Sequence, residues 1–185
     1  MHELSDEKLM EAYKQGDSKA FEMLFDRYEK RLKAYFQKRL SPKQFPEAED
    51  FFQMTWLKLH NNRKSFDSSK KFAPWLYTIA LNVLRDHLRS GRSKALDMPF
   101  DENLATTNGF ETAETTMIGR QQFEKITEGL SILTESQKEI VLLSDWEGFG
   151  SKEISQMLGL KDATVRQQLS RARKSLQLHL KELVK

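Results

Sequence analysis

The C-terminal segment of the chain carries cationic and amide side chains at helical spacing. Apolar residues recur there at intervals of three and four, which predicts a helix with one buried stripe. That stripe comprises Val165, Leu169, Ala172, Leu176 and Leu180. Two exposed rows are expected beside it, one of Arg166, Ser170 and Arg173 and the other of Gln167, Arg171 and Lys174. Arginine and glutamine can form paired hydrogen bonds with guanine and adenine edges, and the other cations suit phosphates. The simpler alternative is a helical hairpin with a solvated basic face.

A second segment interleaves aromatic rings with cations. It contains Phe66, Lys70, Lys71, Phe72, Trp75 and Tyr77, followed by Arg85, Arg89 and Arg92. A cationic groove with stacking aromatics is a typical way to hold single-stranded nucleic acid. Taken alone, Trp75 and Tyr77 are better explained by core packing. Phe66 and Phe72 flank a polar loop, where the sequence gives less reason to expect burial in the core. One exposed helix face is expected to hold Thr78, Asn82, Arg85 and Arg89.

Residues that could carry out catalysis or bind metal are not grouped in this sequence. Its four histidines, His2, His60, His87 and His179, lie far apart without ligand spacing, and it contains no cysteine. Neither a P-loop nor a G-x-G-x-x-G motif occurs. Disulfide scaffolds, thiol nucleophiles and thiolate zinc sites are therefore excluded, and we expect no cofactor and no enzymatic activity.

Charge is distributed unevenly along the 185 residues, whose 30 basic and 27 acidic side chains give a net charge of +3. Residues 1–95 hold 19 basic and 13 acidic side chains, residues 96–120 hold 1 and 5, and residues 121–185 hold 10 and 9. Basic residues cluster further within residues 63–94, with eight basic and two acidic side chains, and within residues 161–185, with seven and two. Two such patches favour an anionic partner, and the alternative is a pair of solvated helix faces. The chain has no long apolar run and no secretory signal, so we expect a soluble, cytoplasmic protein.

The elements that must position these residues are almost all helices, since apolar residues recur at three and four along most of the chain. We expect an all-α fold of two small helical domains. The first domain, residues 1–92, is predicted to contain four helices at residues 6–15, 18–40, 46–62 and 72–89. Asp17 can cap the second helix, Ser41-Pro42 ends it, and Pro46 suits the first turn of the third.

Residues 93–119 are acidic and poor in large apolar side chains, which predicts a flexible linker. The second domain, residues 120–185, begins with a capping box at Thr134 and Gln137. Ser151 can cap the next short helix, Gly159 supplies a left-handed turn, and Asp162 can cap the final helix. This is the pattern of a helix-turn-helix, whose second helix enters the major groove of DNA.

The predicted helix at residues 47–62 is apolar on nearly all sides. Phe52, Trp56 and Leu59 share one face, whereas Phe51, Met54 and Leu57 fall on others. Such a helix is buried on two sides, so it is either a central core helix or a surface for a protein partner.

Several motifs resemble extracytoplasmic-function (ECF) sigma factors of RNA polymerase. The second conserved region of that family resembles Gly16-Asp17-x-x-Ala20-Phe21, Ala48-Glu49-Asp50-x-x-Gln53 and Phe72-Ala73-Pro74-Trp75-Leu76-Tyr77-Thr78-Ile79-Ala80-x-Asn82-x-x-x-Asp86. The fourth resembles Leu133-Thr134-x-x-Gln137-x-x-x-Ile140-x-x-Leu143, Glu147-Gly148-Phe149, Glu153-Ile154 and Thr164-Val165-x-x-x-Leu169-x-Arg171-Ala172. Gly150 departs from the family pattern, because a serine or threonine often stands there.

The resemblance implies a non-enzymatic factor that directs core RNA polymerase to promoters and helps to open the DNA. It assigns binding of the clamp of the largest polymerase subunit to Glu49, Asp50, Gln53, Met54 and Leu57. It assigns the minus-ten element and its non-template strand to Phe66, Asp67, Lys70, Lys71, Phe72, Trp75, Thr78, Asn82, Arg85, Arg89 and Arg92. It assigns the minus-thirty-five duplex to Lys161, Ala163, Thr164, Arg166, Gln167, Ser170, Arg171, Arg173 and Lys174.

Further partners follow from the same resemblance. The flap of the second-largest polymerase subunit is a second contact, and an anti-sigma factor is expected to hold the protein inactive, in the cytoplasm or at the inner membrane. The main competing interpretation is a stand-alone helix-turn-helix regulator with a helical sensor domain, which would bind duplex operators unaided as a symmetric dimer.

Overall fold

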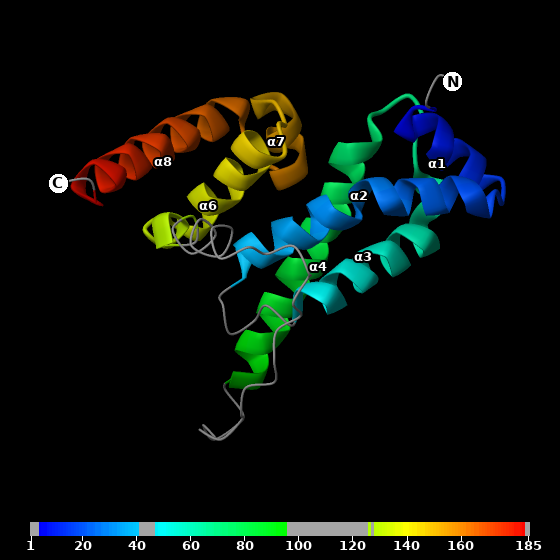
Figure 1. The fold of residues 1–185 in the computed structure, drawn as a ribbon, viewed down its shortest axis with the longest axis horizontal. Helices are drawn as coiled ribbons and strands as arrows, with labels where there is room; N and C mark the ends of the chain where they lie inside the picture. Colours follow the sequence, from blue (N-terminus) through cyan, green and yellow to red (C-terminus); the bar gives the residue numbers. More distant parts are fainter. Residues whose placement is uncertain (1–3, 41–46, 96–125, 127, 184–185) are drawn as a thin grey trace. The chain divides into compact units, whose positions relative to one another are not determined.

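The computed structural model describes residues 4–40, 47–95, 126 and 128–183 of the chain, and the described residues form helices and no strand (Figure 1). The predicted all-α fold class is thus confirmed. Contacts divide the chain into two compact units, Met1–Gly109 and Phe110–Lys185. The predicted boundaries of the linker, residues 93 and 119, stay a prediction, since residues 96–125 lie outside the described residues.

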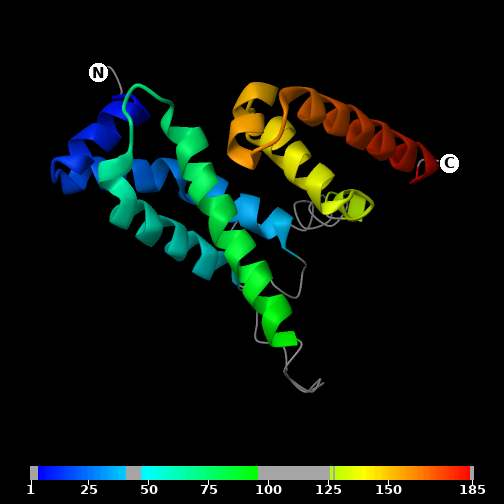
Figure 2. The same ribbon diagram turned by 180° about the vertical axis from the view of Figure 1, so that it is seen from behind.

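The described residues of the first unit form four α-helices, as predicted. They are α1 (Asp6–Lys14), α2 (Ser18–Arg39), α3 (Glu47–Asn62) and α4 (Phe72–Ala95), with a short 3₁₀ turn, η2 (Arg63–Ser65), after α3. Both views show α4 crossing α2 and α3 (Figures 1 and 2). The helix α4 continues six residues past the predicted end at Arg89, so the predicted domain boundary after residue 92 falls inside it.

Local capping explains where the first two helices begin. Ser5 caps α1, and Asp17 caps α2 by accepting hydrogen bonds from the backbone amides of Lys19 at 2.9 Å and Ala20 at 3.3 Å. The turn between these helices needs Gly16, whose φ of 103° lies in the left-handed region. The predicted roles of Ser41-Pro42 and Pro46 concern residues outside the described part.

Aromatic rings form much of the core of the first unit. Trp56 of α3 contacts Phe21 and Phe25 of α2, with ring centroids 5.4 and 5.2 Å apart. At the other end of the core, Tyr35 meets Tyr77 edge to face at 5.4 Å. Edge-to-face packing of this kind adds stability beyond the burial of area, so this helix bundle is held together by specific ring contacts.

The second unit contains α6 (Glu135–Val141), a π-helical segment η3 (Leu142–Trp146), α7 (Ser151–Leu158) and α8 (Asp162–Leu183). Residues 126 and 128–131 are also helical. The capping box is confirmed, because Thr134 and Gln137 bond to each other's backbone amides at 3.3 and 3.1 Å. Gly159 ends α7 with a φ of 67°, as the helix-turn-helix pattern predicts.

Two predicted caps in this unit are wrong by one residue. Gly150, not Ser151, precedes α7, and the carboxylate of Glu153 accepts a hydrogen bond from the Gly150 amide at 2.9 Å. Glycine is acceptable there because the Glu153 half of a capping box needs only the backbone amide. Asp162 is the first residue of α8, and its carboxylate pairs with Arg166 at 3.0 Å.

Candidate nucleic-acid interfaces

The nine residues of the second unit that were predicted to contact DNA lie together on α8 and the turn before it. Thr164 is half-buried and the rest are exposed, namely Lys161, Ala163, Arg166, Gln167, Ser170, Arg171, Arg173 and Lys174. Val165 and Ala172 are fully buried beneath them, so the opposite face of α8 holds it in the unit. A shallow concave surface runs along α8, lined by Arg166, Leu169, Ser170, Arg173, Lys174 and Gln177.

The predicted buried stripe of α8 weakens toward its C-terminus. Leu169 and Leu176 are half-buried, and Leu180 is 59% exposed, so the prediction of burial is wrong for Leu180. The physical reason is visible in both views, where the last turns of α8 extend past the helices that cover its first half (Figures 1 and 2).

Two of the α8 arginines form ion pairs within the second unit. Arg173 donates two hydrogen bonds to the carboxylate of Asp145 in η3, and these raise the pKa of the guanidinium. Arg166 pairs with Asp162 one turn earlier. Because exposed pairs of this kind contribute little net stability, a phosphate can replace the carboxylates at small cost. The pairs therefore hold the guanidinium groups in place without removing them from the exposed face.

Some aromatic rings of the aromatic-cationic segment, residues 66–92 of the first unit, are buried. Phe66 is 3% exposed and Phe72 is fully buried, so neither ring presents a face to a base in this structure, and their place among the minus-ten contacts stays a prediction. The reason is that the polar loop between them is short enough for both rings to pack together, with centroids 5.9 Å apart. Phe72 also meets Tyr28 of α2 edge to face at 5.4 Å.

Trp75 is the ring of this segment that keeps partial exposure. It is half-buried, and its centroid lies 5.0 Å from that of Phe66. Tyr77 is fully buried, which confirms the core-packing alternative for that residue. One face of a tryptophan supported by a buried phenylalanine is a rigid surface on which a base can stack.

Polar residues precede Trp75 on the loop and follow it along α4. Asp67, Lys70, Lys71, Asn82 and Arg85 are exposed, and Thr78 is half-buried. The hydroxyl of Thr78 donates to the Pro74 carbonyl at 2.7 Å, so its oxygen is the part left to face a ligand. Arg89 and Arg92 are in α4, but their side chains lie outside the description.

Asp67 stabilises the turn of the loop with its own hydrogen bonds, and its predicted contact with the minus-ten strand stays a prediction. Its carboxylate accepts hydrogen bonds from the amide of Ser69 at 3.0 Å and from the hydroxyl of the same residue at 2.7 Å. These bonds lower the pKa of the Asp67 carboxyl. A turn stabilised in this way presents Lys70 and Lys71 next to the start of α4.

The third set of predicted residues lies along α3. Phe51, Phe52, Trp56 and Leu59 are buried, so α3 is a core helix on one side. On the other side Asp50, Gln53, Met54 and Leu57 recur at helical spacing, and Met54 and Leu57 are 44% and 61% exposed. Glu49 sits at the edge of this stripe and pairs with Lys33 of α2 at 2.9 Å. The core-helix alternative for α3 therefore holds for one side, the other side leaves apolar residues exposed, and its role as a partner surface stays a prediction.

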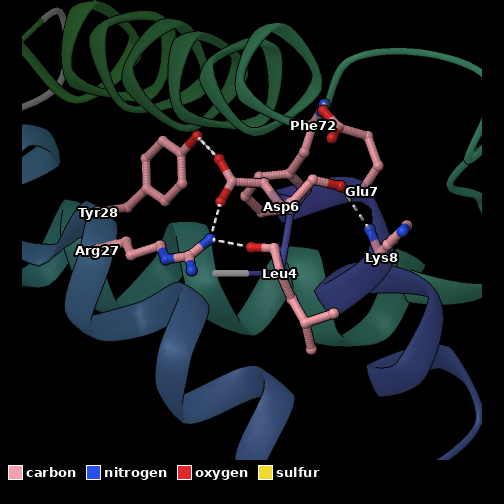
Figure 3. A network of polar contacts seen from close by, with 8 residues as sticks. Leu4, Asp6, Glu7, Lys8, Arg27, Tyr28 and Phe72 are labelled. Carbon is pink, nitrogen blue, oxygen red and sulfur yellow. Dashed lines mark hydrogen bonds and ion pairs between the residues drawn. The ribbon is translucent and has the colours of Figure 1, made fainter. Parts of the chain in front are cut away.

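Sequence reasoning missed the contacts that α1 makes with the aromatic-cationic loop. The Phe72 amide, the first of α4, donates to the Glu7 carboxylate at 3.0 Å, and the Lys14 ammonium donates to the Phe66 carbonyl at 2.9 Å. Next to Glu7, Asp6 accepts hydrogen bonds from Arg27 and Tyr28 of α2 (Figure 3). The contacts to the loop join residues 65 and 52 positions apart, and no local sequence signal reports them.

No group of histidine and carboxylate side chains that could hold a metal ion occurs in the part of the chain that the structure describes. Within the same residues, none of the helices combines the length and the apolar character that crossing a membrane requires.

Comparisons with known proteins match both units in order. A family model for Sigma-70 region 2 matches residues 24–94, and one for Sigma-70 region 4 matches residues 123–176. The ECF RNA polymerase sigma-E factor of Haemophilus influenzae is 25% identical over 189 residues, which cover 98% of each chain. ECF RNA polymerase sigma factor SigW of Bacillus subtilis is 26% identical, with 98% of this chain and 100% of SigW covered.

Two solved structures show the same fold. One is CnrH in complex with the cytosolic domain of CnrY, with a TM-score of 0.72 and 21% identity over 96% of this chain and 97% of CnrH. The other is the sigma factor RpoE in complex with the anti-sigma factor NepR from Bartonella quintana, with a TM-score of 0.70 and 24% identity over 88% of this chain and 98% of RpoE.

Proposed function

The chain belongs to the extracytoplasmic-function group of the sigma-70 family, and from this premise we propose that its two units read two separate promoter elements. As a sigma factor it is not an enzyme: it binds core RNA polymerase and directs it to promoter DNA. This proposal for two promoter elements rests on one observation: each unit exposes its own cationic surface, one on a loop and one along a helix. Residues 1–92 and 120–185 would form the two readers, with residues 93–119 between them.

The second unit would bind the minus-thirty-five element as duplex. The N-terminal turns of α8 offer Arg166 and Gln167 for base edges, since the recognition helix of a helix-turn-helix enters the major groove there. Lys161, Ser170, Arg171 and Lys174 would contact phosphates. Arg173 would do the same while Asp145 fixes its orientation.

The first unit would capture the non-template strand of the minus-ten element. Trp75 would stack on a base, while Lys70, Lys71, Asn82 and Arg85 line the approach to it. Phe66 and Phe72 would support Trp75 from the core instead of touching DNA. Arg89 and Arg92, later in the sequence of α4, stay predicted contacts of the same strand.

The exposed stripe of α3 would bind the clamp of the largest polymerase subunit. Met54 and Leu57 supply apolar area that the first unit leaves uncovered, and Asp50 and Gln53 supply its polar edge. An apolar centre with a polar rim is the usual anatomy of a protein interface. The second unit would contact the flap of the second-largest subunit.

Strand capture by the chain alone is too weak to open DNA. Each base-pair step in a duplex is worth about 1.4 kcal/mol, so opening about ten pairs costs more than 10 kcal/mol. Stacking a base on an aromatic ring contributes only about 1–3 kcal/mol. Core polymerase must therefore supply most of the remaining free energy.

An anti-sigma factor is the partner that we propose for the inactive state. RpoE was solved with the anti-sigma factor NepR, and CnrH with the cytosolic domain of CnrY. A partner of this class would hold the protein in the cytoplasm, or at the inner membrane if the partner itself spans it.

Run-off transcription over a promoter library, with and without bacterial core RNA polymerase, tests the proposed function. We expect promoter-specific transcripts and a footprinted bubble only when core enzyme is present. Opening by the purified chain alone would contradict the mechanism. Tight duplex binding by a symmetric dimer, without any effect on transcription by core enzyme, would favour the stand-alone regulator.

A matched pair of variants tests the core-binding face. Leu57→Glu should abolish co-purification with core polymerase and leave duplex binding by the second unit unchanged. Met23→Glu is the control, because Met23 is also an exposed apolar residue, 41% exposed on α2, but lies outside the proposed face. Equal loss in both variants would remove the α3 stripe from the interface.

A further inference from the structure

The loop that joins η2 to α4 is held at both of its ends by one helix. At its start the Phe66 carbonyl accepts from the Lys14 ammonium at 2.9 Å. At its end the Phe72 amide donates to the Glu7 carboxylate at 3.0 Å. Lys14 and Glu7 both belong to α1, and both views show the connection between α3 and α4 passing beside this helix (Figures 1 and 2).

The residues between the two fixed points are the exposed ones. Asp67, Ser68, Ser69, Lys70 and Lys71 are all exposed, while the rings of Phe66 and Phe72 at the two ends are buried. The loop is therefore anchored at each end by one buried ring and one polar bond to α1. Its middle is left to face a ligand.

The hydrogen bond that Glu7 accepts also satisfies a backbone amide at the start of α4. The first amides of a helix lack partners within the helix, so an acceptor must come from elsewhere. For α4 a carboxylate from α1 takes that place at the Phe72 amide, and it favourably meets the positive end of the helix dipole. The Glu7 carboxyl accordingly has a lowered pKa, caused first by this backbone hydrogen bond.

α1 is itself fixed on the opposite side. Asp6 accepts hydrogen bonds from Arg27 at 2.7 Å and from the Tyr28 hydroxyl, and Arg27 also donates to the Leu4 carbonyl at 2.8 Å (Figure 3). Burial and Asp6 raise the pKa of Tyr28, so its hydroxyl stays protonated and keeps donating. Neighbouring carboxylates thus face in two directions, Asp6 toward α2 and Glu7 toward α4.

We propose that α1 holds residues 66–72 at two points, through Glu7 and Lys14. These two are positioning residues that set how selectively the loop captures the minus-ten strand. The inference rests on the proposed function of the first unit. Neither residue needs to touch DNA. Each acts by holding one end of the loop, so that Lys70, Lys71 and Trp75 keep a fixed arrangement before the strand arrives.

Amide hydrogen exchange of the full chain provides the first test. Glu7→Ala removes the acceptor, and Lys14→Met removes the donor while keeping an unbranched apolar stem. Both should raise exchange at residues 67–73 by roughly tenfold, as expected for losing a charge-assisted hydrogen bond. Glu7→Gln keeps a side-chain acceptor for the Phe72 amide and should recover part of the protection.

Asp6→Asn is the matched control, because it changes the neighbouring carboxylate, whose bonds are directed to α2. It should loosen the contact of α1 with α2 and leave exchange at residues 67–73 much closer to wild type than Glu7→Ala does. If Asp6→Asn raised exchange in the loop as much as Glu7→Ala does, the effect would be general destabilisation. The proposal that α1 holds the loop at two points would then be refuted.

Run-off transcription with bacterial core polymerase over a randomised minus-ten library provides the second test. Glu7→Ala and Lys14→Met should broaden the base preference at minus-ten at least threefold and leave the minus-thirty-five preference unchanged. A retained minus-ten preference in both variants, alongside a loosened loop, would overturn the positioning role. If Glu7→Ala does not fold, Lys14→Met alone decides between these outcomes. Failure of the wild-type chain to direct any promoter-specific transcription would instead refute the proposed function.

Discussion

The two units expose cations in different structural settings. In the second unit the cations lie on one continuous helix, α8, and the helix-turn-helix fixes them through the buried Val165 and Ala172. In the first unit they lie on a loop and on the helix after it, and the loop is fixed by buried rings and by distant side chains. A regular helix suits a regular duplex groove, whereas an irregular single strand needs a surface built from several elements.

The two DNA-binding surfaces are therefore sensitive to different substitutions. The register of α8 follows from its own hydrogen bonds, so single substitutions on its exposed face should change binding without changing its shape. The loop of the first unit depends on packing and on α1, so changes far from DNA should alter how it binds.

The largest effect is expected from Phe72→Ala. Phe72 is fully buried against Tyr28, Phe66 and Trp75, so truncation should lower the free energy of unfolding of the first unit by about 3–5 kcal/mol. Residue-resolved hydrogen exchange measures the change. Ile154→Ala, a fully buried site in α7, is the counterpart and should destabilise only the second unit. Faster exchange in both units from either variant would mean that they do not fold independently.

Trp75→Ala is expected to have the next largest effect, and mainly on function. Its ring is half-buried, so the variant should keep a normal circular-dichroism spectrum and lose about 1–3 kcal/mol of strand binding. Promoter opening with core enzyme, followed by footprinting, measures that loss. Trp146→Ala is the control in the second unit, where the tryptophan is 42% exposed. Wild-type opening by Trp75→Ala would leave the aromatic-cationic segment without a partly exposed ring for stacking.

Arg171→Ala should weaken duplex binding by the second unit through one lost phosphate contact. The slope of log K against log salt should decrease by about 0.9, which corresponds to roughly an eightfold weaker affinity at 0.1 M salt. Arg173→Ala should change the slope less, because Asp145 already pairs with that guanidinium. Fluorescence anisotropy on a minus-thirty-five duplex at several salt concentrations distinguishes the two. Equal slopes for wild type and Arg171→Ala would remove Arg171 from the phosphate contacts.

The sequence predicted the exposed cationic surface of the second unit better than that of the first, for a physical reason. The exposed rows of α8, the capping box at Thr134 and the left-handed Gly159 all depend on spacing within one or two turns. Leu180 was misplaced because burial at the end of α8 depends on how far the neighbouring helices reach. The π-helical turn that brings Asp145 to Arg173 likewise has no local signal.

In the first unit the helices could be predicted and the loop could not. Hydrophobic periodicity placed α1 to α4, although α4 extends further than predicted. Whether Phe66 and Phe72 face solvent depends on a core built from α2 and α4, and the bonds from Glu7 and Lys14 join residues far apart in the chain. These contacts exist only once the helices have packed, so spacing in the sequence does not show them.

The smallest effect is expected in how the stability of the first unit depends on acidic pH. Glu7 and Asp67, whose carboxyl pKa values are lowered by hydrogen bonds from the Phe72 amide and from Ser69, both belong to the first unit. A carboxyl whose pKa is lower in the folded state contributes stability that is present above its unfolded pKa and is lost as pH falls through the folded value. For Glu7 the unfolded value is 4.5, so the loss should begin below about that pH.

Glu7→Gln should therefore flatten the acid dependence of stability in the first unit and lower its stability at neutral pH by about 0.3–1 kcal/mol, the usual value of a carboxylate at a helix N-terminus. Ser5 and Lys71 also face Glu7 and lower its pKa, and both stay in place in this variant. Urea unfolding between pH 3 and pH 7, resolved by unit through hydrogen exchange, measures the change. Glu22→Gln, an exposed glutamate of α2, is the control. The free energy of unfolding could instead fall with acid in Glu7→Gln as it does in the wild type. Losing the charge that strengthens the bond to the Phe72 amide would then have no effect, so this bond would not stabilise the folded loop.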